Sequence, residues 1–196
     1  MSNYQSEYLK YKKRYLNSKL QIGGSSDYEP DKSRVINIEE ETVSNQDYRR
    51  VIYTSDFSQL VLMTLKPGVE IGMELHEDVD QFIRIEKGYA RYSKNGERKN
   101  YNEETSKNQL DPQNRNIIYD KEMKPTGIVV NNEVGELPQD HVLLVPHNTW
   151  HNVWNPVDAT EDVHIYTLYS FAKQNPPHKK DMATQHEKKD EPFEQH

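Results

Sequence analysis

The fold is decided by the stretch Gly68-Val-Glu-Ile-Gly-Met-Glu74-Leu-His76-Glu-Asp-Val-Asp-Gln81-Phe-Ile-Arg-Ile-Glu-Lys-Gly88. Glu74 and His76 are two residues apart, so on a strand both side chains leave the same face of a sheet. Gln81 follows an acidic turn and is placed to face back from the next strand. A second stretch, Pro146-His-Asn-Thr-Trp-His151-Asn-Val-Trp-Asn155, brings another imidazole from far along the chain. Convergence of these four side chains inside a β-barrel would form a small metal or ligand site.

The surrounding sequence indicates an all-β domain. Short apolar runs recur, and we expect strands at residues 35–38, 50–54, 59–65, 69–76, 81–86, 89–93, 127–130, 141–145, 149–154 and 163–170. Pro67-Gly68 and Asn95-Gly96 mark turns, and the second is a hairpin signal. No convincing helix pattern lies between these runs. Many short strands in succession are typical of a sandwich or a barrel.

Composition divides the 196 residues into three parts. Only 33% of the residues are hydrophobic, but nearly all the Val, Ile and Leu lie in residues 34–172, which suffice for one domain with a buried core. We therefore expect a helix and linker at 1–33, the domain at 34–172 and a polar, extended tail at 173–196. A long, polar, irregular insertion at 97–126 interrupts the domain, as a lid, an interaction loop or a disordered segment.

The net charge of −7 is unevenly distributed. The first 24 residues hold five basic residues and one acid, and the tail is neutral, so residues 25–172 carry −11. An acidic body argues against nucleic-acid binding by the core, which needs Lys and Arg surfaces. The lack of cysteine excludes disulfides, thiolate catalysis and Cys-type zinc sites. The sequence shows neither a membrane-length apolar run nor a signal-peptide pattern, so we expect no membrane span and no conventional secretion.

Residues 3–20 predict an amphipathic helix. Tyrosines recur at helical spacing, at positions 4, 8, 11 and 15, basic residues fill the other face, and Gly23-Gly24 ends the pattern. So aromatic a stripe indicates either docking on a protein partner or packing on the chain's own domain. The leader, residues 1–24, is also a candidate for cleavage after Gly24.

The two motif stretches resemble those of the cupin superfamily, small jelly-roll barrels whose two motifs supply a metal site. The first motif is matched as Gly68-x5-Glu74-x-His76-x4-Gln81-x6-Gly88, with every spacing intact. The second is matched as Asp140-x5-Pro146-x-Asn148-x2-His151-x3-Asn155.

The departures from the cupin motifs are informative. Asp140 and Asn148 replace turn glycines, and Asp and Asn tolerate positive φ better than other non-glycine residues, so the fold should survive. Glu74 stands where the family has its first histidine, and Gln81 stands where it has glutamate. These two changes alter the residues that would bind the metal.

By this resemblance the fold is all-β, a double-stranded β-helix (the cupin jelly-roll barrel) with an added N-terminal helix. Glu74, His76, Gln81 and His151 would then hold a divalent transition metal. Two imidazoles and one carboxylate suit Fe(II), and Mn(II), Ni(II) or Zn(II) would also fit. Because the amide of Gln81 is neutral, Glu74 would have to supply the negative charge. The alternative is an inherited barrel whose ligands have decayed.

The resemblance extends beyond the motifs. Residues 49–68, 76–88 and 145–155 are similar to compact, single-domain bacterial-type cupins described as sugar-phosphate-isomerase-like. Separately, residues 8–24 resemble a leader shared by proteins of mimivirus-like giant viruses. That similarity implies a virus-borne protein, located in the host cytoplasm or the virion.

Three classes of function remain open. The first is a metal-dependent enzyme acting on a small molecule, isomerase-like or dioxygenase-like. In that class His164 and Tyr166, which alternate on the last strand, are candidate catalytic residues that act as acid, base or hydrogen-bond donor. The alternative, favoured for His164, is a pair that faces outward or is structurally satisfied. The second class is a non-catalytic module that binds a sugar or another small polar ligand. The third is a virion-associated structural or packaging protein built on the barrel.

Other positions have expected places in the barrel. Ile83, Ile85 and Val153 should face inward, because they follow Gln81 and His151 at strand period. Trp150 and Trp154 share the face opposite His151, which indicates packing or contacts in a homodimer. For Arg84, flanked by apolar residues, we expect an ion pair, with Glu86 or across a dimer interface.

Overall fold

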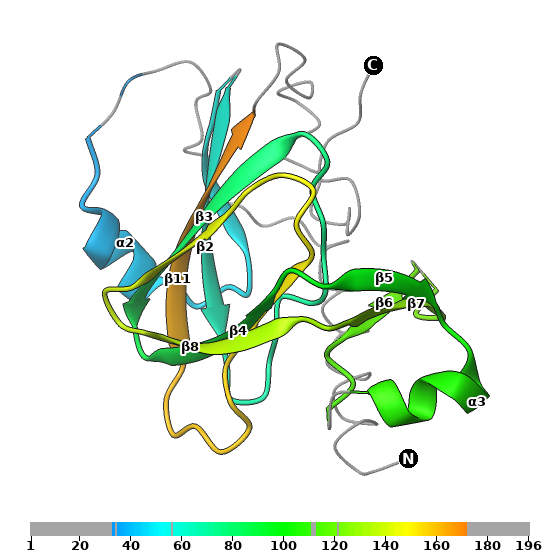
Figure 1. The fold of residues 1–196 in the computed structure, drawn as a ribbon. Helices are drawn as coiled ribbons and strands as arrows, with labels where there is room; N and C mark the ends of the chain where they lie inside the picture. Colours follow the sequence, from blue (N-terminus) through cyan, green and yellow to red (C-terminus); the bar gives the residue numbers. More distant parts are fainter. Residues whose placement is uncertain (1–32, 34, 56, 111–112, 121, 172–196) are drawn as a thin grey trace.

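The computed structural model describes residues 33, 35–55, 57–110, 113–120 and 122–171. Figure 1 shows a β-barrel with a helix on its outside and a small sheet beside it. The elements are α2 (Ile38–Ser44), β1 (Arg50–Thr54), β2 (Ser58–Leu65), β3 (Val79–Lys87), β4 (Tyr89–Lys94), β5 (Glu97–Asn100), α3 (Glu103–Ser106), a 3-10 turn (Lys107–Gln109), β6 (Ile117–Tyr119), β7 (Pro125–Val130), β8 (Glu133–Pro138), β9 (Val142–Val145), β10 (His151–Trp154) and β11 (Val163–Phe171). The predicted N-terminal helix and tail lie outside the described residues.

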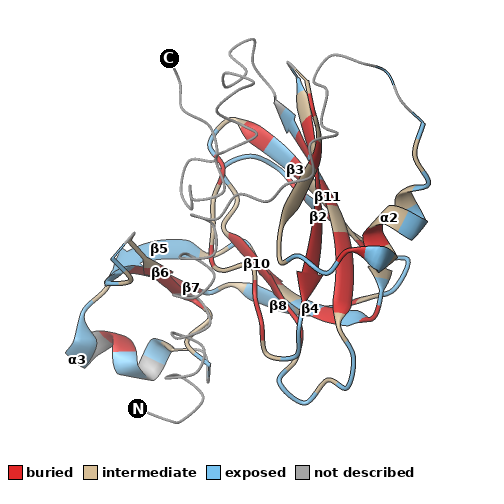
Figure 2. Ribbon diagram, turned by 180° about the vertical axis from the view of Figure 1, so that it is seen from behind, coloured by how far each residue is buried: buried red, intermediate tan, exposed pale blue. Residues whose placement is uncertain are grey.

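Two sheets form the barrel. One has the strand order β1-β2-β11-β3-β9, and the other has the order β10-β4-β8. Alternate side chains of each strand enter the space between the sheets, which Figure 2 shows as bands of buried residues. Ile83, Ile85 and Val153 are fully buried there, as predicted. The all-β jelly-roll fold predicted from the sequence is therefore confirmed.

The segment predicted as a strand at 35–38 instead leads into helix α2. The Asn37 side chain accepts a hydrogen bond from the Glu40 amide and caps the helix. The helix lies on the outer face of the five-stranded sheet, where Glu41 pairs with Arg50 and the Asn45 amide donates to Thr64 Oγ1 (2.9 Å). The strand prediction was wrong because a cap and three glutamates in the first turn favour a helix.

The insertion is folded, contrary to the expectation of an irregular segment. Strands β5, β7 and β6 form a third sheet, and α3 follows β5 below this sheet in Figure 1. Lys94 pairs with Glu133, and three residues further on Glu97 pairs with Val130, so the pairing register of β4 with β8 continues unbroken into β5 with β7. Asn95-Gly96 is therefore not a hairpin turn. It is a kink in one long two-stranded ribbon, with both residues at positive φ.

Special backbone positions fall where the motifs predicted them. Asp140 and Asn148 have φ of 63° and 58°, which confirms that they replace turn glycines in the left-handed region. Gly88 has φ of +91°, and a Cβ added there would lie 2.7 Å from the carbonyl oxygen of Asp162. Only glycine fits at this junction between β3 and β4.

The outer face of the five-stranded sheet carries an apolar row that crosses all its strands. The residues of this outer row are paired in register: Leu144, Phe82, Leu168, Leu60 and Tyr53. Leu144 is 67% exposed, and Tyr166 stacks on Phe82 with ring centroids 6.0 Å apart. α2 covers a different part of the same face, beside Thr64. Among the described residues, none covers Leu144.

Candidate metal centre

The backbone around Glu74 is fixed by β10. The Glu74 amide donates to the His151 carbonyl, and the His151 amide donates back to the Glu74 carbonyl, both at 3.0 Å. The predicted strand at 69–76 forms only isolated bridges to β10, because Gly72 turns the chain with φ of 103°. The Gly72 amide is satisfied by Asn152 Oδ1 at 3.0 Å. Glu74 and His151 are thereby set directly opposite each other.

The structure brings the four predicted donors together inside the barrel. Glu74 Oε1 lies 3.4 Å from His76 Nε2 and 3.3 Å from His151 Nε2. Gln81 Oε1, on β3, lies 2.8 Å from the same His151 nitrogen. Two ligands bound about 2.1 Å from one ion at right angles would be about 3 Å apart, so these spacings suit a shared metal. His76, Gln81 and His151 are each at most 3% exposed.

The donor set fits a cation because lone pairs face lone pairs. The Thr149 carbonyl lies 2.9 Å from His151 Nδ1, which assigns the proton of the neutral ring to Nδ1 and leaves a lone pair on Nε2. Gln81 Nε2 donates to Thr167 Oγ1 (3.1 Å), so Oε1 of the same amide also presents lone pairs to the centre. Within the described part of the chain, Glu74 Oε1 and His76 Nε2 have no hydrogen-bond partner. Buried acceptors without donors are costly unless a cation joins them.

Glu74 is ionised in this environment. In the metal-free protein, burial raises its pKa, but the charge of a protonated His76 and hydrogen bonds from both histidines, whose protons stand where the cation would bind, outweigh burial and lower the pKa from 4.5 to about 2. An ionised carboxylate and two imidazoles are the residues that could hold a metal, and their ligand atoms lie within 4.8 Å of one another.

The lowered pKa of Glu74 predicts acid sensitivity of the metal-free protein. Because the folded pKa of about 2 lies below the ordinary value of 4.5, Glu74 stabilises the fold above pH 4.5 and loses that contribution as the pH falls towards 2. Urea unfolding of chelator-treated protein across this range should show the loss, of about 3 kcal/mol at most. The Glu74→Gln variant should show a flatter curve; an equally steep one would contradict the assignment.

The folded insertion packs against the backbone that carries the ligands. Met73 and Trp150, neighbours of Glu74 and His151, form a second hydrophobic cluster with Ile118 and Val129 of the insertion. The packing predicted for Trp150 is thus confirmed. Trp154 is also buried and lies under the Arg115 guanidinium, 4.7 Å from the ring centroid.

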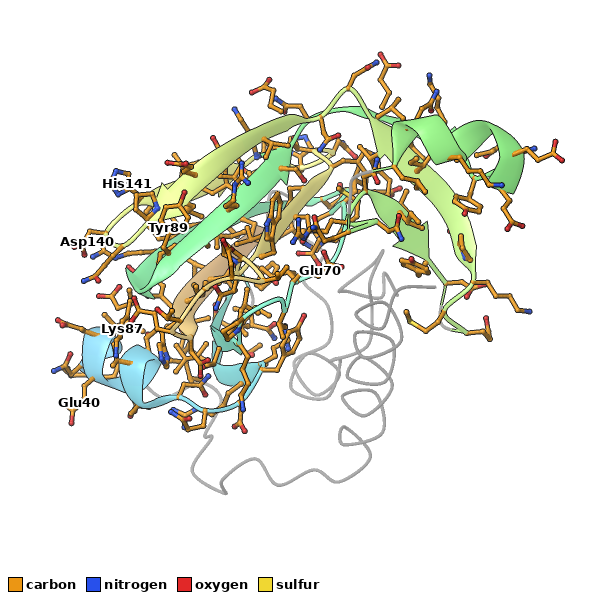
Figure 3. All side chains as sticks on the ribbon, turned by 90° about the horizontal axis from the view of Figure 1, so that it is seen from below. Glu40, Glu70, Lys87, Tyr89, Asp140 and His141 are labelled. Atoms are coloured by element: carbon orange, nitrogen blue, oxygen red, sulfur yellow. The ribbon has the colours of Figure 1, made fainter. Side chains whose placement is uncertain are left out.

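A buried polar contact completes this junction. The Asn152 amide donates to Glu70 Oε2 (2.9 Å) and to the Arg115 carbonyl (3.2 Å). In Figure 3, Glu70 lies where the barrel meets the insertion, far from the turn that carries Asp140 and His141. The insertion therefore holds one side of the ligand-bearing segments.

Comparison with known proteins places the chain among relatives of unassigned function. It is 36% identical over 142 residues to the uncharacterized protein L612 of Acanthamoeba polyphaga mimivirus, covering 72% of this chain and 68% of that protein. It is 34% identical over 144 residues to the uncharacterized protein YrkC of Bacillus subtilis, covering 74% of this chain and 60% of YrkC. The chain thus spans about two thirds of the first relative and less of the second. No family model matches the sequence.

A solved structure agrees with the fold. The crystal structure of BH2720 from Bacillus halodurans superposes with a TM-score of 0.52 at 26% identity, over 73% of this chain and 84% of that one. The comparison with a cupin-2 domain protein from Shewanella frigidimarina gives a TM-score of 0.41 at 14% identity, with coverage of 69% and 94%. The barrel, both motifs at their spacings and a 36% identical relative decide the family. The chain belongs to the cupin superfamily.

The two candidate catalytic residues, His164 and Tyr166, lie on the outer face of the cupin barrel, whereas the four metal-ligand candidates lie inside it. On β11 the core residues Val163 and Ile165 face inward, so His164 and Tyr166 face outward. His164 is 6% exposed and pairs with Thr64, beside the Asn45 contact of α2. Tyr166 stacks on Phe82. The outward-facing alternative for His164 matches this placement.

Sequence reasoning missed the inward residues of β11. Tyr169 is 5% exposed, and its ring lies edge-on to His76 with centroids 5.5 Å apart. Burial raises the pKa of its hydroxyl, and the charge of Glu74 raises it further. Thr167 holds the Gln81 amide. The signal for these residues was the alternation of the strand, because Thr167 and Tyr169 share the face of Val163 and Ile165. Apolar residues on the other face of β11 obscured which face is the inner one.

Two surface groups flank the ligand-bearing segments. His147 is exposed, and its Nδ1 contacts Asp80 at 3.1 Å rather than any of the four donors. Arg84 pairs with Glu86 at 2.8 Å, which confirms the intrachain form of the predicted ion pair, and also with Asp140 at 2.9 Å.

Proposed function

We propose that this cupin is a metal-dependent enzyme that acts on a small molecule, isomerase-like or oxidoreductase-like. The observation that carries the proposal is the meeting of Glu74, His76, Gln81 and His151, all acceptors, at one buried point. A bound Fe, Mn, Ni or Zn ion would act there as a Lewis acid that polarises a substrate oxygen. The chain's own residues would bind the ion and exclude water by their burial. The Thr149 carbonyl orients the His151 ring, and the Thr167 hydroxyl orients the Gln81 amide.

The metal content of the full-length protein tests this proposal. Protein purified without chelator should carry close to one transition metal per chain by elemental analysis. His151→Ala should lose it, whereas His147→Ala removes a nearby imidazole from the surface and should retain it. Wild-type protein that stays free of metal even after metal addition would exclude the metal-dependent function.

A non-catalytic binding module is the second candidate, favoured by the neutral Gln81 in place of an acid, which weakens the ligand set. For this class, a ligand should raise the melting temperature equally with and without metal. The ligand-induced Tm shift should also persist in the Glu74→Ala variant. The enzyme proposal instead requires that the shift depend on the metal and on Glu74.

The homodimer expected from the sequence has a candidate surface, the outer row of Leu144, Phe82, Leu168, Leu60 and Tyr53. This apolar strip, exposed at Leu144 and Leu168 and half-buried at its other three residues, would fit against a second copy of itself. We expect wild-type protein to elute as a dimer and Leu144→Glu to elute as a monomer in size-exclusion chromatography with light scattering. A monomeric wild type would refute the dimer.

The leader and the location of the protein stay predictions. Residues 1–24 lie outside the described residues, so partner docking, cleavage after Gly24 and a role in the virion are untested. Among the described helices, none is long and apolar enough to cross a membrane. Deletion of 1–24 should change partner association or packaging and leave the barrel folded.

A further inference from the structure

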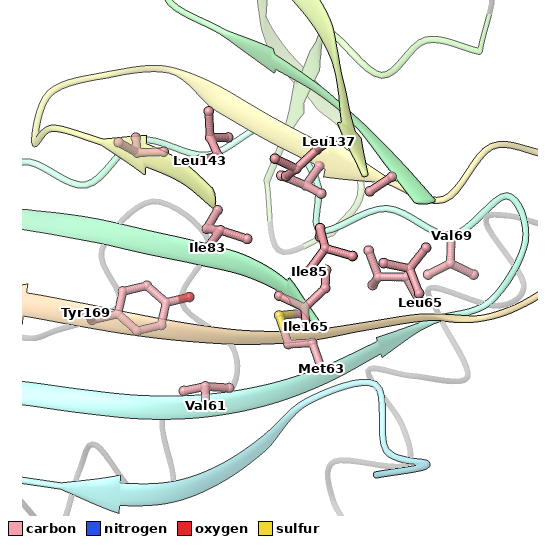
Figure 4. Close-up of a cluster of buried hydrophobic side chains, with 14 of the residues drawn as sticks. Val61, Met63, Leu65, Val69, Ile83, Ile85, Leu137, Leu143, Ile165 and Tyr169 are labelled. Carbon is pink, nitrogen blue, oxygen red and sulfur yellow. The ribbon is translucent and has the colours of Figure 1, made fainter. Parts of the chain in front are cut away.

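The inner face of the five-stranded sheet changes from apolar to polar along the barrel. At one end it presents core side chains such as Met63, Leu65 and Ile85, which Figure 4 shows packed together. At the other end an inner row crosses the five strands in register: Val145, Gln81, Tyr169, Gln59 and Thr54. Because Gln81 belongs to this row, the polar end of the barrel is the end that holds the metal ligands.

A permanent cation reaches the inner row from the start of β1. The Arg49 guanidinium donates to Gln59 Oε1 at 3.1 Å and also hydrogen-bonds the hydroxyl of Tyr169. Arg49 is half-buried, and the Tyr169 ring contacts His76. One aromatic side chain therefore separates the guanidinium from a metal ligand.

The charges along this line favour an anion. With a divalent ion bound, the single negative charge of Glu74 leaves one positive charge in excess, and Arg49 adds a second. The inner row between them carries no formal charge, since its side chains are those of valine, glutamine, tyrosine and threonine. A positive interior in an acidic body selects an anionic ligand by electrostatic complementarity. The planar guanidinium matches the oxygens of carboxylates and phosphates.

We propose that the ligand of this barrel is a small organic molecule with an oxyanion, a carboxylate or a phosphate ester, that reaches from the metal to Arg49. Arg49 binds the oxyanion, and Tyr169 donates a hydrogen bond to the ligand between its two ends. This inference rests on the proposed metal-dependent function and names the substrate class for the same site.

Calorimetric titration of the full-length chain loaded with Mn(II) tests the proposal. The probes are succinate, glycerol 3-phosphate and, as the uncharged control, glycerol. We expect at least one anion to bind and glycerol not to. Arg49→Met should weaken that binding at least about tenfold, because hydrogen bonds to charged groups are the stronger ones. Arg91→Met removes the same charge from an exposed position on β4 and should leave binding unchanged.

The outcomes distinguish a failure of this inference from a failure of the proposed metal-dependent function. Preference for succinate or for glycerol 3-phosphate identifies the carboxylate or the phosphate form of the proposal. Equal binding by Arg49→Met and Arg91→Met, or failure of both anions to bind Mn-loaded protein, overturns the inference and leaves the metal centre standing. Failure to take up Mn(II) overturns both.

Folding of the variant has its own check. If Arg49→Met does not fold by circular dichroism, Arg49→Lys carries the comparison, since it keeps the charge and loses the planar fork. Several-fold weaker anion binding at unchanged Mn content supports the inference, and unchanged binding overturns it.

Discussion

Replacing Glu74 with glutamine is expected to weaken metal binding by at least about a hundredfold. Changes in groups that only orient a metal ligand cost 10–100-fold, and Glu74→Gln removes the only negative charge among the four donors. The lowered pKa of Glu74 keeps that charge in place down to about pH 2 in the wild type. Competition with a fluorescent chelator would measure the affinity.

The same variant should lose the thermal stabilisation that metal gives. Metal at a hundred times its Kd stabilises a protein by about 2.7 kcal/mol, or roughly 5–10 °C for a domain of this size. The exposed Glu133→Gln, which also removes one carboxylate, should keep both the affinity and the Tm shift. Unchanged affinity in Glu74→Gln would remove Glu74 from the ligand set.

Exchanging the two side chains is expected to restore what the single variant loses. Glu74→Gln/Gln81→Glu returns the ligand charge to −1, with the carboxylate now on β3, and both Oε1 atoms lie within 3.3 Å of His151 Nε2. We expect the affinity to return to within about tenfold of wild type, because the attraction between the ion and an adjacent negative charge contributes most of the affinity that Glu74→Gln loses.

The single variant Gln81→Glu is the control for the double variant in which the two side chains are exchanged. Two carboxylates would then face each other in the metal-free protein, so metal affinity should rise while stability without metal falls. Chelator competition and urea unfolding measure the two quantities. A double variant as weak as Glu74→Gln would show that Glu74 contributes geometry rather than charge.

Motif spacing predicted the fold because strand period and turn residues are local properties of the chain. The predicted strands at 50–54, 59–65, 81–86, 89–93, 141–145, 149–154 and 163–170 are confirmed to within two residues at each end. Strand β5, with the sequence Glu-Arg-Lys-Asn, was missed because all four side chains are exposed. Only its partner β7 makes it a strand.

The four donors could be placed from the sequence for the same local reason, although metal binding by them stays a proposal. Arg49 and Tyr169 could not be placed. Their meeting depends on the register of β11 against β2, which joins residues more than a hundred positions apart. The face of the sheet on which His164 lies could not be predicted either. Val163 and Ile165 on one face of the strand alternate with Tyr166 and Leu168 on the other, so both faces carry apolar residues.

The continuous ribbon of β4–β5 and β7–β8 has a structural consequence. Lys94 and Glu133 already face each other, so a chain that ran directly from Gly96 to Glu133 would close an ordinary two-residue Asn-Gly hairpin. Residues 97–132 therefore have the form of a cassette set into one tight loop, which leaves the register of the flanking strands undisturbed. A barrel without this cassette would leave Met73 and Trp150 without the cover of Ile118 and Val129.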